Sequence, residues 1–170
     1  MPQEQTKELC ERTRGHLRDA NRLLNDFLDQ HNLRTLTSEE SERSGNENFL
    51  REFLADLRRL AVFCDLGYEK VSLVLRRAKF NEEFAAKVLN EVFRSCVNNF
   101  YCPRNEVYEE DGRYSYTNRD AFRFREEPPE SLKELTFRLS RIFEKLRDEL
   151  EYYETDPITR LRMQRHSATS

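Results

Sequence analysis

The chain has 170 residues, of which 36% are charged and 37% hydrophobic, and its net charge is −3. A chain of this length can bury a core without disulfides, and its hydrophobic residues recur periodically, which excludes an intrinsically disordered protein. The slightly acidic balance excludes a general attraction to nucleic acid or to anionic membranes.

The composition also indicates a compartment. No apolar run approaches the roughly 20 residues that span a bilayer, and the polar N-terminus lacks the apolar centre of a signal peptide. We therefore expect a cytoplasmic protein without a membrane partner. None of the cysteines forms a Cys-x-x-Cys pair and the histidines are scattered, so the sequence predicts buried, reduced thiols, no metal site and no cofactor: Cys10, Cys64, Cys96 and Cys102.

The N-terminal part of the chain predicts one amphipathic helix followed by a loop. Residues 4–31 place apolar side chains at the spacing of one helical stripe: Leu17, Ala20, Leu24, Phe27 and Leu28. Residues 37–48 are polar and contain Gly45, which is typical of a loop.

The longest predicted helix covers residues 47–77. Two apolar series recur every seven residues and keep their phase across Gly67: Leu50, Leu57, Cys64 and Val71, and Phe53, Leu60, Gly67 and Val74. Gly67 either lets a neighbouring backbone approach closely or causes a mild kink. Other apolar residues lie around the helix axis, so this helix is either central in its own domain or buried by a partner: Leu54, Leu57, Ala61, Val62 and Phe63.

A third helix is predicted from Asn81 to Tyr101. Asn81 has the residue type of an N-cap, and the acidic Glu82 and Glu83 follow it in the first turn. Pro103 ends the pattern.

Residues 105–125 have the period of strands, not of helices. Asp111-Gly112 is a two-residue hairpin signal, because both turn residues need a positive φ. This turn pairs Glu110 with Arg113, and a second turn at 118–120 completes a three-stranded antiparallel meander. One face then carries Val107, Glu109, Tyr114, Tyr116, Phe122 and Phe124, and we expect it to pack on the helices.

The opposite face of the meander is the candidate binding surface. It carries Tyr108, Ser115, Thr117, Arg123 and Arg125. Because Arg and Tyr dominate interface hot spots, the candidate partner-binding residues are Tyr108, Arg113, Arg123 and Arg125. The alternative is an ordinary solvated sheet face that only covers the core.

The last helix opens at Glu127-Pro128-Pro129 and ends before Pro157. Four amphipathic segments joined by short loops predict an antiparallel four-helix bundle, mainly α, with the hairpin or meander inserted at 105–125. We expect a single domain over residues 1–156. Residues 157–170 carry arginines and form a basic, flexible tail.

Three stretches resemble a family of small uncharacterised proteins from Bacillus-type bacteria, the YpuI-like proteins. They are Leu-Arg-Arg-Leu-Ala-Val-Phe-Cys at 57–64, Tyr-Glu-Glu-Asp-Gly-Arg-Tyr-Ser-Tyr-Thr at 108–117, and the helix after Pro128-Pro129 that ends Glu-Leu-Glu-Tyr-Tyr-Glu-Thr-Asp at 149–156. The resemblance implies a cytoplasmic bacterial protein with one domain. It implies no catalytic residues, because the family has no established activity.

The sequence favours a non-catalytic binding or scaffold protein. The glycines are isolated, so no loop cradles a phosphate, and neither a Gly-x-Ser-x-Gly nor a His-Glu-x-x-His motif is present. We expect a protein partner, and self-association into a homo-oligomer is an open alternative. Nucleic-acid binding through the hairpin and tail arginines is the second function, although residues 104–125 contain as many acidic residues as arginines.

Overall fold

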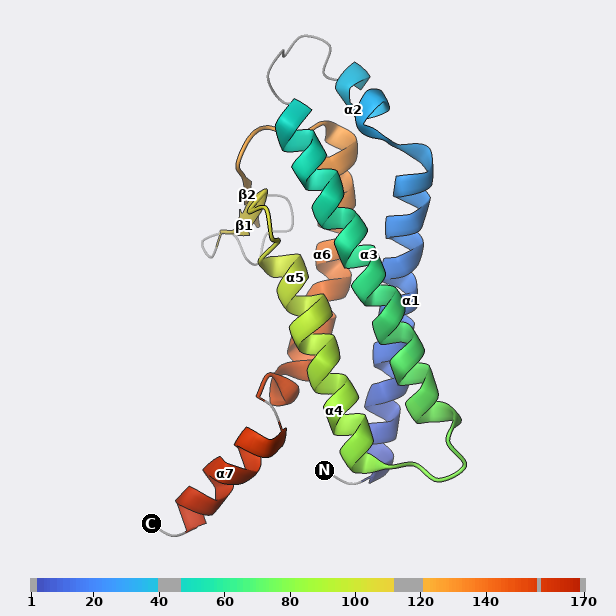
Figure 1. Ribbon diagram of the computed structural model, residues 1–170, viewed down its shortest axis with the longest axis vertical. Helices are drawn as coiled ribbons and strands as arrows, with labels where there is room; N and C mark the ends of the chain where they lie inside the picture. The colour runs from blue at the N-terminus through green and yellow to red at the C-terminus, as the bar shows by residue number, and fades with distance from the viewer. Residues whose placement is uncertain (1–2, 40–46, 112–120, 156, 169–170) are drawn as a thin grey trace.

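The computed structural model describes residues 3–39, 47–111, 121–155 and 157–168. Its main helices are α1 (Gln3–Gln30), α3 (Glu47–Arg76), α4 (Glu82–Val92) and α6 (Glu130–Leu150). The other helices are α2 (Leu33–Glu39), α5 (Asn98–Tyr101) and α7 (Pro157–Ala168). Along the chain, α1, α3, the α4–α5 segment and α6 alternate in direction and lie side by side (Figure 1). Together with a small antiparallel sheet, this confirms the mainly helical class.

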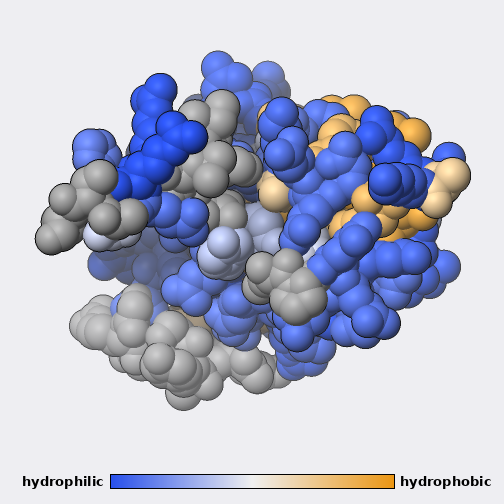
Figure 2. All heavy atoms as spheres, turned by 90° about the horizontal axis from the view of Figure 1, so that it is seen from below, coloured by the Kyte–Doolittle hydropathy of each residue, from blue (hydrophilic) through white to orange (hydrophobic). Residues whose placement is uncertain are grey.

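Helix α3 is central in this arrangement. It contacts α1, α2 and α4, and both of its predicted seven-residue series are buried: Leu50, Leu57, Cys64 and Val71, and Phe53, Leu60, Gly67 and Val74. This central position explains why apolar side chains lie around most of the helix axis. Three apolar residues of α3 are nevertheless exposed: Val62, Leu66 and Leu73. Figure 2, which views the molecule from below, shows hydrophobic surface on the right. The lower half of α3 lies on the same side in Figure 1.

A short helix replaces part of the predicted loop at 37–48. The α2 helix begins after Asn32, whose side chain accepts a hydrogen bond from the backbone N–H of Thr35 at 2.9 Å. The backbone N–H of Asn32 in turn donates to the Thr35 hydroxyl. Such reciprocal bonds stabilise a helix start. Leu36, which precedes the predicted loop, buries its side chain in the core.

The third predicted helix contains one wide turn. Asn81 caps α4 as predicted, because its side chain accepts from the backbone N–H of Phe84 at 3.1 Å. A π-helical turn, η1 (Phe93–Val97), joins α4 to α5. This turn lies against α3 at Gly67, where an added Cβ would lie 3.3 Å from the Cys96 sulfur. The atoms closest to this position belong to the side chains of Cys96, Leu17 and Val92 and not to a neighbouring backbone, so Gly67 makes room for side-chain packing.

The sheet has two described strands, β1 (Tyr108–Glu110) and β2 (Phe122–Phe124). They pair antiparallel with Tyr108 opposite Phe124 and Glu110 opposite Phe122. The predicted first strand thus pairs directly with the predicted third. The predicted middle strand and its Glu110–Arg113 pair involve residues 112–120, which lie outside the described residues, so the three-stranded meander is not confirmed.

Helix α6 ends as predicted, before Pro157. Its last turn continues into a 3₁₀ turn, η2 (Glu151–Tyr153). The buried Asn90 of α4 donates a hydrogen bond from its side-chain amide to the Tyr153 carbonyl at 2.7 Å. This bond gives the carbonyl at the end of the segment a partner. Beyond it, α7 is helical, whereas the sequence predicted a flexible tail. Figure 1 shows that α7 points away from the other helices.

Candidate functional site

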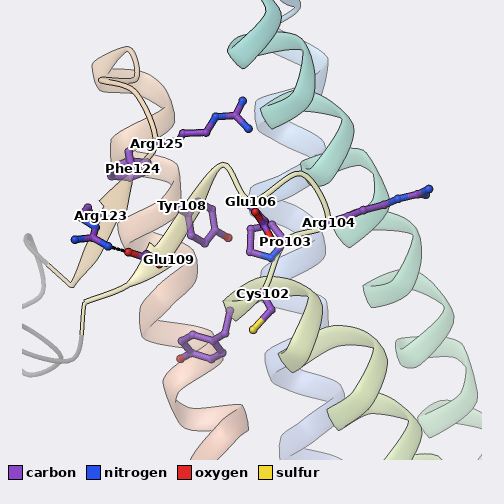
Figure 3. Close-up of a pocket in the computed structure, with 10 residues that line it drawn as sticks. Cys102, Pro103, Arg104, Glu106, Tyr108, Glu109, Arg123, Phe124 and Arg125 are labelled. Carbon is purple, nitrogen blue, oxygen red and sulfur yellow. Dashed lines mark ion pairs between the residues drawn. The ribbon is translucent and has the colours of Figure 1, made fainter.

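A solvent-open cavity of about 880 Å³ adjoins the sheet. It lies where the end of α5, the loop 102–107 and both strands meet. Its lining combines aromatic rings, cations and carboxylates: Tyr101, Cys102, Pro103, Arg104, Glu106, Tyr108, Glu109, Arg123, Phe124 and Arg125. Three predicted site residues are therefore brought to one cavity (Figure 3). The fourth, Arg113, lies outside the described residues.

The cavity loop is anchored to α3 by a buried carboxylate. Asp56 accepts hydrogen bonds from the Asn105 backbone N–H at 3.1 Å and from the Asn105 side-chain amide at 3.0 Å. Burial raises the pKa of Asp56, and the hydrogen bonds from Asn105 oppose this effect. The next residue, Glu106, has a φ of 50°. Residues other than glycine rarely adopt this left-handed backbone conformation, because it is sterically unfavourable. The hydrogen bonds that anchor the preceding Asn105 to α3 hold the loop in this conformation.

Tyr108 faces the core, which corrects the prediction that it faces outward with Arg123 and Arg125. It is only 6% exposed, and its hydroxyl donates to the Phe100 carbonyl at 2.7 Å. Opposite residues of an antiparallel pair share one face, so Tyr108 lies with Phe124 on the inner side. Its ring packs against Phe53, Phe100, Phe122 and Phe124. The prediction assumed that β1 paired with residues 113–117, and this register placed Tyr108 on the wrong face.

Arg123 does face outward as predicted. It pairs with the opposite residue on β1, Glu109, and the two side chains are 68% and 59% exposed. An ion pair so open to solvent contributes little free energy. Arg123 is therefore available to a partner.

Arg125 is bound within the protein. Its guanidinium pairs with Glu52 of α3, donates to the Asn105 carbonyl at 3.0 Å and lies over the Phe49 ring. These contacts join β2 and the cavity loop to α3. Arg125 thus has a structural role as well as a place in the cavity lining, and its role as a binding residue stays a prediction.

The sequence pattern gave no indication of Arg104 and Cys102 as site residues. Arg104 makes no ion pair or hydrogen bond with any residue in the described ranges, and it points away from the sheet in Figure 3. Cys102 is exposed, whereas Cys10, Cys64 and Cys96 are buried, so the prediction of buried thiols fails at this position. Both residues follow the end of a helix in an irregular loop, where no periodic pattern indicates which way a side chain points.

Tyr101, which lines the cavity, has a buried hydroxyl without a partner in the described ranges. The Tyr101 oxygen is buried and makes no hydrogen bond to the part of the chain that the structure describes. Burial raises the pKa of Tyr101, so this group is a neutral phenol. The guanidinium of Arg147 stacks on its ring at 4.1 Å and pairs with Glu110 of β1 at 3.0 Å. These contacts attach the sheet to α6.

The described residues offer neither a metal cluster nor a membrane-spanning helix. No three His, Cys, Asp or Glu side chains within them gather as ligands for a metal ion. No helix in the same ranges is both long and apolar enough to cross a membrane.

The family of the chain follows from comparison with known proteins. The family described as "Protein of unknown function (DUF3907)" matches residues 10–159, which include every residue of the cavity lining. The chain belongs to this family. It is also 37% identical over 131 residues to the uncharacterized protein YpuI of Bacillus subtilis (strain 168), a match that covers 77% of this chain and 72% of YpuI.

The family assignment confirms the resemblance seen in the three sequence stretches. Its function is unknown, so no site residue can be transferred from it. No solved structure matches the chain. The cavity must therefore be interpreted from its own chemistry.

Proposed function

We propose that this protein is a non-catalytic protein-binding module, in which an antiparallel four-helix bundle supports the cavity beside the sheet. The observation that carries the proposal is the cavity of about 880 Å³, whose lining combines Arg123, Arg104 and Phe124. Arginine and aromatic side chains are the groups that most often dominate binding energy at protein interfaces.

The two faces of the sheet divide the structural and the binding roles. The inner face, with Tyr108 and Phe122, is buried against the helices and covers one end of the core. The outer residues Glu109 and Arg123 are exposed, and their ion pair joins the two strands to each other and not to a helix. A sheet that only covers the core needs no particular side chains on its outer face. A sheet that binds a partner would use the exposed charges of that face.

Nucleic-acid association is the alternative function. Arg162 and Arg165 of α7 favour it, because the helix contains no acidic residue. The cavity itself favours it less, because Glu106 and Glu109 lie among the arginines and would repel a phosphate backbone.

Cys102 allows the cavity to be blocked without changing its charges. As the exposed thiol, it should react with a bulky maleimide while the three buried cysteines do not. Affinity capture from an extract of the source bacterium, followed by mass spectrometry, would then compare labelled and unlabelled protein. The Cys102→Ser variant treated with the same reagent is the matched control.

We expect a defined protein to be recovered by unlabelled protein and by the treated Cys102→Ser variant, but not by labelled protein. Recovery that labelling leaves unchanged would rule out the cavity as the binding surface. Capture of nucleic acid in place of protein would favour the alternative function, and no capture at all would count against a binding module.

A further inference from the structure

We infer that the partner of this cavity is an extended acidic segment of another protein, with an apolar side chain between two acidic ones. The inference rests on the proposed function, and it adds the chemistry of the ligand. It follows from which cations are available, where they point, and what lies between them.

Only two of the three cavity arginines are available to a ligand. Arg125 is held by Glu52 and by the Asn105 carbonyl. Arg104 has no partner within the described ranges. Arg123 has one partner, Glu109, in a pair that is more than half exposed on both sides and that an incoming carboxylate can replace at low cost.

The two available arginines do not converge. In Figure 3, Arg123 points to one side of the cavity and Arg104 to the opposite side. A compact anion such as inorganic phosphate cannot contact both guanidinium groups. An extended chain with two separated carboxylates can, because successive residues of an extended segment advance about 3.3 Å each.

The lining between the two arginines is partly apolar. In Figure 3, Tyr108 and Pro103 lie between them and Phe124 lies beside Arg123. The Phe124 ring is only partly buried against the core. This surface fits an apolar side chain of the ligand. The same part of the cavity carries Glu106 and Glu109. Repulsion from these carboxylates disfavours a continuous polyanion but not a peptide with neutral residues opposite them.

A random peptide library selected against the intact protein would test the inference, because such a selection requires only the binding surface and not the cellular partner. We expect the enriched peptides to carry acidic residues on both sides of an apolar residue. Arg104→Glu and Arg123→Glu should each weaken binding of an enriched peptide by about tenfold, the loss expected for one charged contact. Arg138→Glu, which reverses another exposed arginine on α6, should leave binding unchanged.

Glu109→Gln provides a test with the opposite sign. Removing the carboxylate that competes for Arg123 should strengthen binding of an acidic peptide by several fold. A purely structural role of the Arg123–Glu109 pair would not produce this gain. Thermal unfolding of every variant would confirm that it is folded, and neutral Arg104→Gln and Arg123→Gln variants replace any charge reversal that is not.

Several outcomes would overturn the inference. These are enriched peptides without acidic residues, acidic peptides that bind the reversed variants equally well, no enrichment, and displacement of an enriched peptide by a single-stranded oligonucleotide. If a cellular partner is lost on blocking Cys102 but acidic peptides do not bind, the inference fails and the proposed function stands. If blocking Cys102 leaves the capture of a cellular partner unchanged and acidic peptides do not bind, both the inference and the proposed function are rejected.

Discussion

Two arginines on one strand segment differ in their roles because of what lies beside them. Arg123 and Arg125 are two residues apart and have the same side-chain chemistry. Among the described residues, Arg123 pairs with Glu109 across the sheet, whereas Arg125 reaches α3 and the backbone of the cavity loop. The contribution of each side chain to stability is therefore set by its neighbours and not by its position in the strand pattern.

These environments predict different losses on truncation. Arg125→Ala should lower the free energy of unfolding by about 1 kcal/mol, because it removes both the hydrogen bond to the Asn105 carbonyl and the ion pair with Glu52. Arg123→Ala should change it by less than about 0.5 kcal/mol, as is usual for an exposed pair. Urea unfolding of both variants measures the difference. Equal losses would contradict the assignment of Arg125 as structural.

Asp56 predicts a pH dependence of stability. Its pKa is raised by burial in the folded state, so its contribution to stability is greatest at low pH and falls as the pH rises through the folded pKa. Asp56→Asn removes this titration. The stability of the wild type relative to Asp56→Asn should therefore decrease from about pH 4 upward. Urea unfolding of both proteins over this range measures it, and a relative gain with rising pH would show that the carboxylate is favoured in its charged form.

At the scale of elements, the contact between α3 and η1 determines how closely the helices pack. Gly67 leaves room for Leu17 and Cys96, each 3.3 Å from where its Cβ would be. The Cys96 thiol also donates to the Phe63 carbonyl of α3 at 3.3 Å. The π-helical turn and the missing side chain thus lie at the same contact.

Two glycines in helices should respond oppositely to substitution. Gly15→Ala should stabilise the protein by up to about 1 kcal/mol, because nothing lies within 4 Å of the added Cβ and alanine favours a helix. Gly67→Val should destabilise it by about 1–3 kcal/mol through overpacking. Thermal and urea unfolding would test both. Stabilisation by Gly67→Val would show that the side chains around Gly67 can shift to accommodate the added volume.

At the scale of the whole molecule, the last residues differ in how they are attached. The segment up to Glu154 is tied to α4 by Asn90, whose amide donates to the Tyr153 and Glu154 carbonyls. Beyond it, α7 contacts α4, and residues 162–167 are exposed. The domain boundary that the sequence predicts near residue 156 would fall between these two segments.

Truncation tests this boundary. Removing residues 157–170 should change the free energy of unfolding by less than about 1 kcal/mol, because it removes mainly exposed side chains. Asn90→Ala should cost about 1–3 kcal/mol, because it leaves buried carbonyls unpaired. If truncation instead costs several kcal/mol, α7 is part of the folded domain and the boundary is wrong.

Local sequence was sufficient to predict the long helices and their buried faces. The seven-residue series from Leu50 and Phe53, the N-cap at Asn81 and the end of the chain's last long helix before Pro157 depend on periodicity and backbone chemistry, which are present in any short window. The same is true of the two outer strand segments, whose alternation and aromatic residues are local properties.

The sheet partner and the cavity, in contrast, depend on long-range packing. Pairing β1 with β2 turned Tyr108 inward, because a change of partner strand changes which residues lie opposite one another. The anchoring of Asn105 by Asp56 and of Arg125 by Glu52 joins residues far apart in the chain, and no local pattern encodes these pairs. Arg104, Arg123 and Cys102 were brought to one cavity by that same packing.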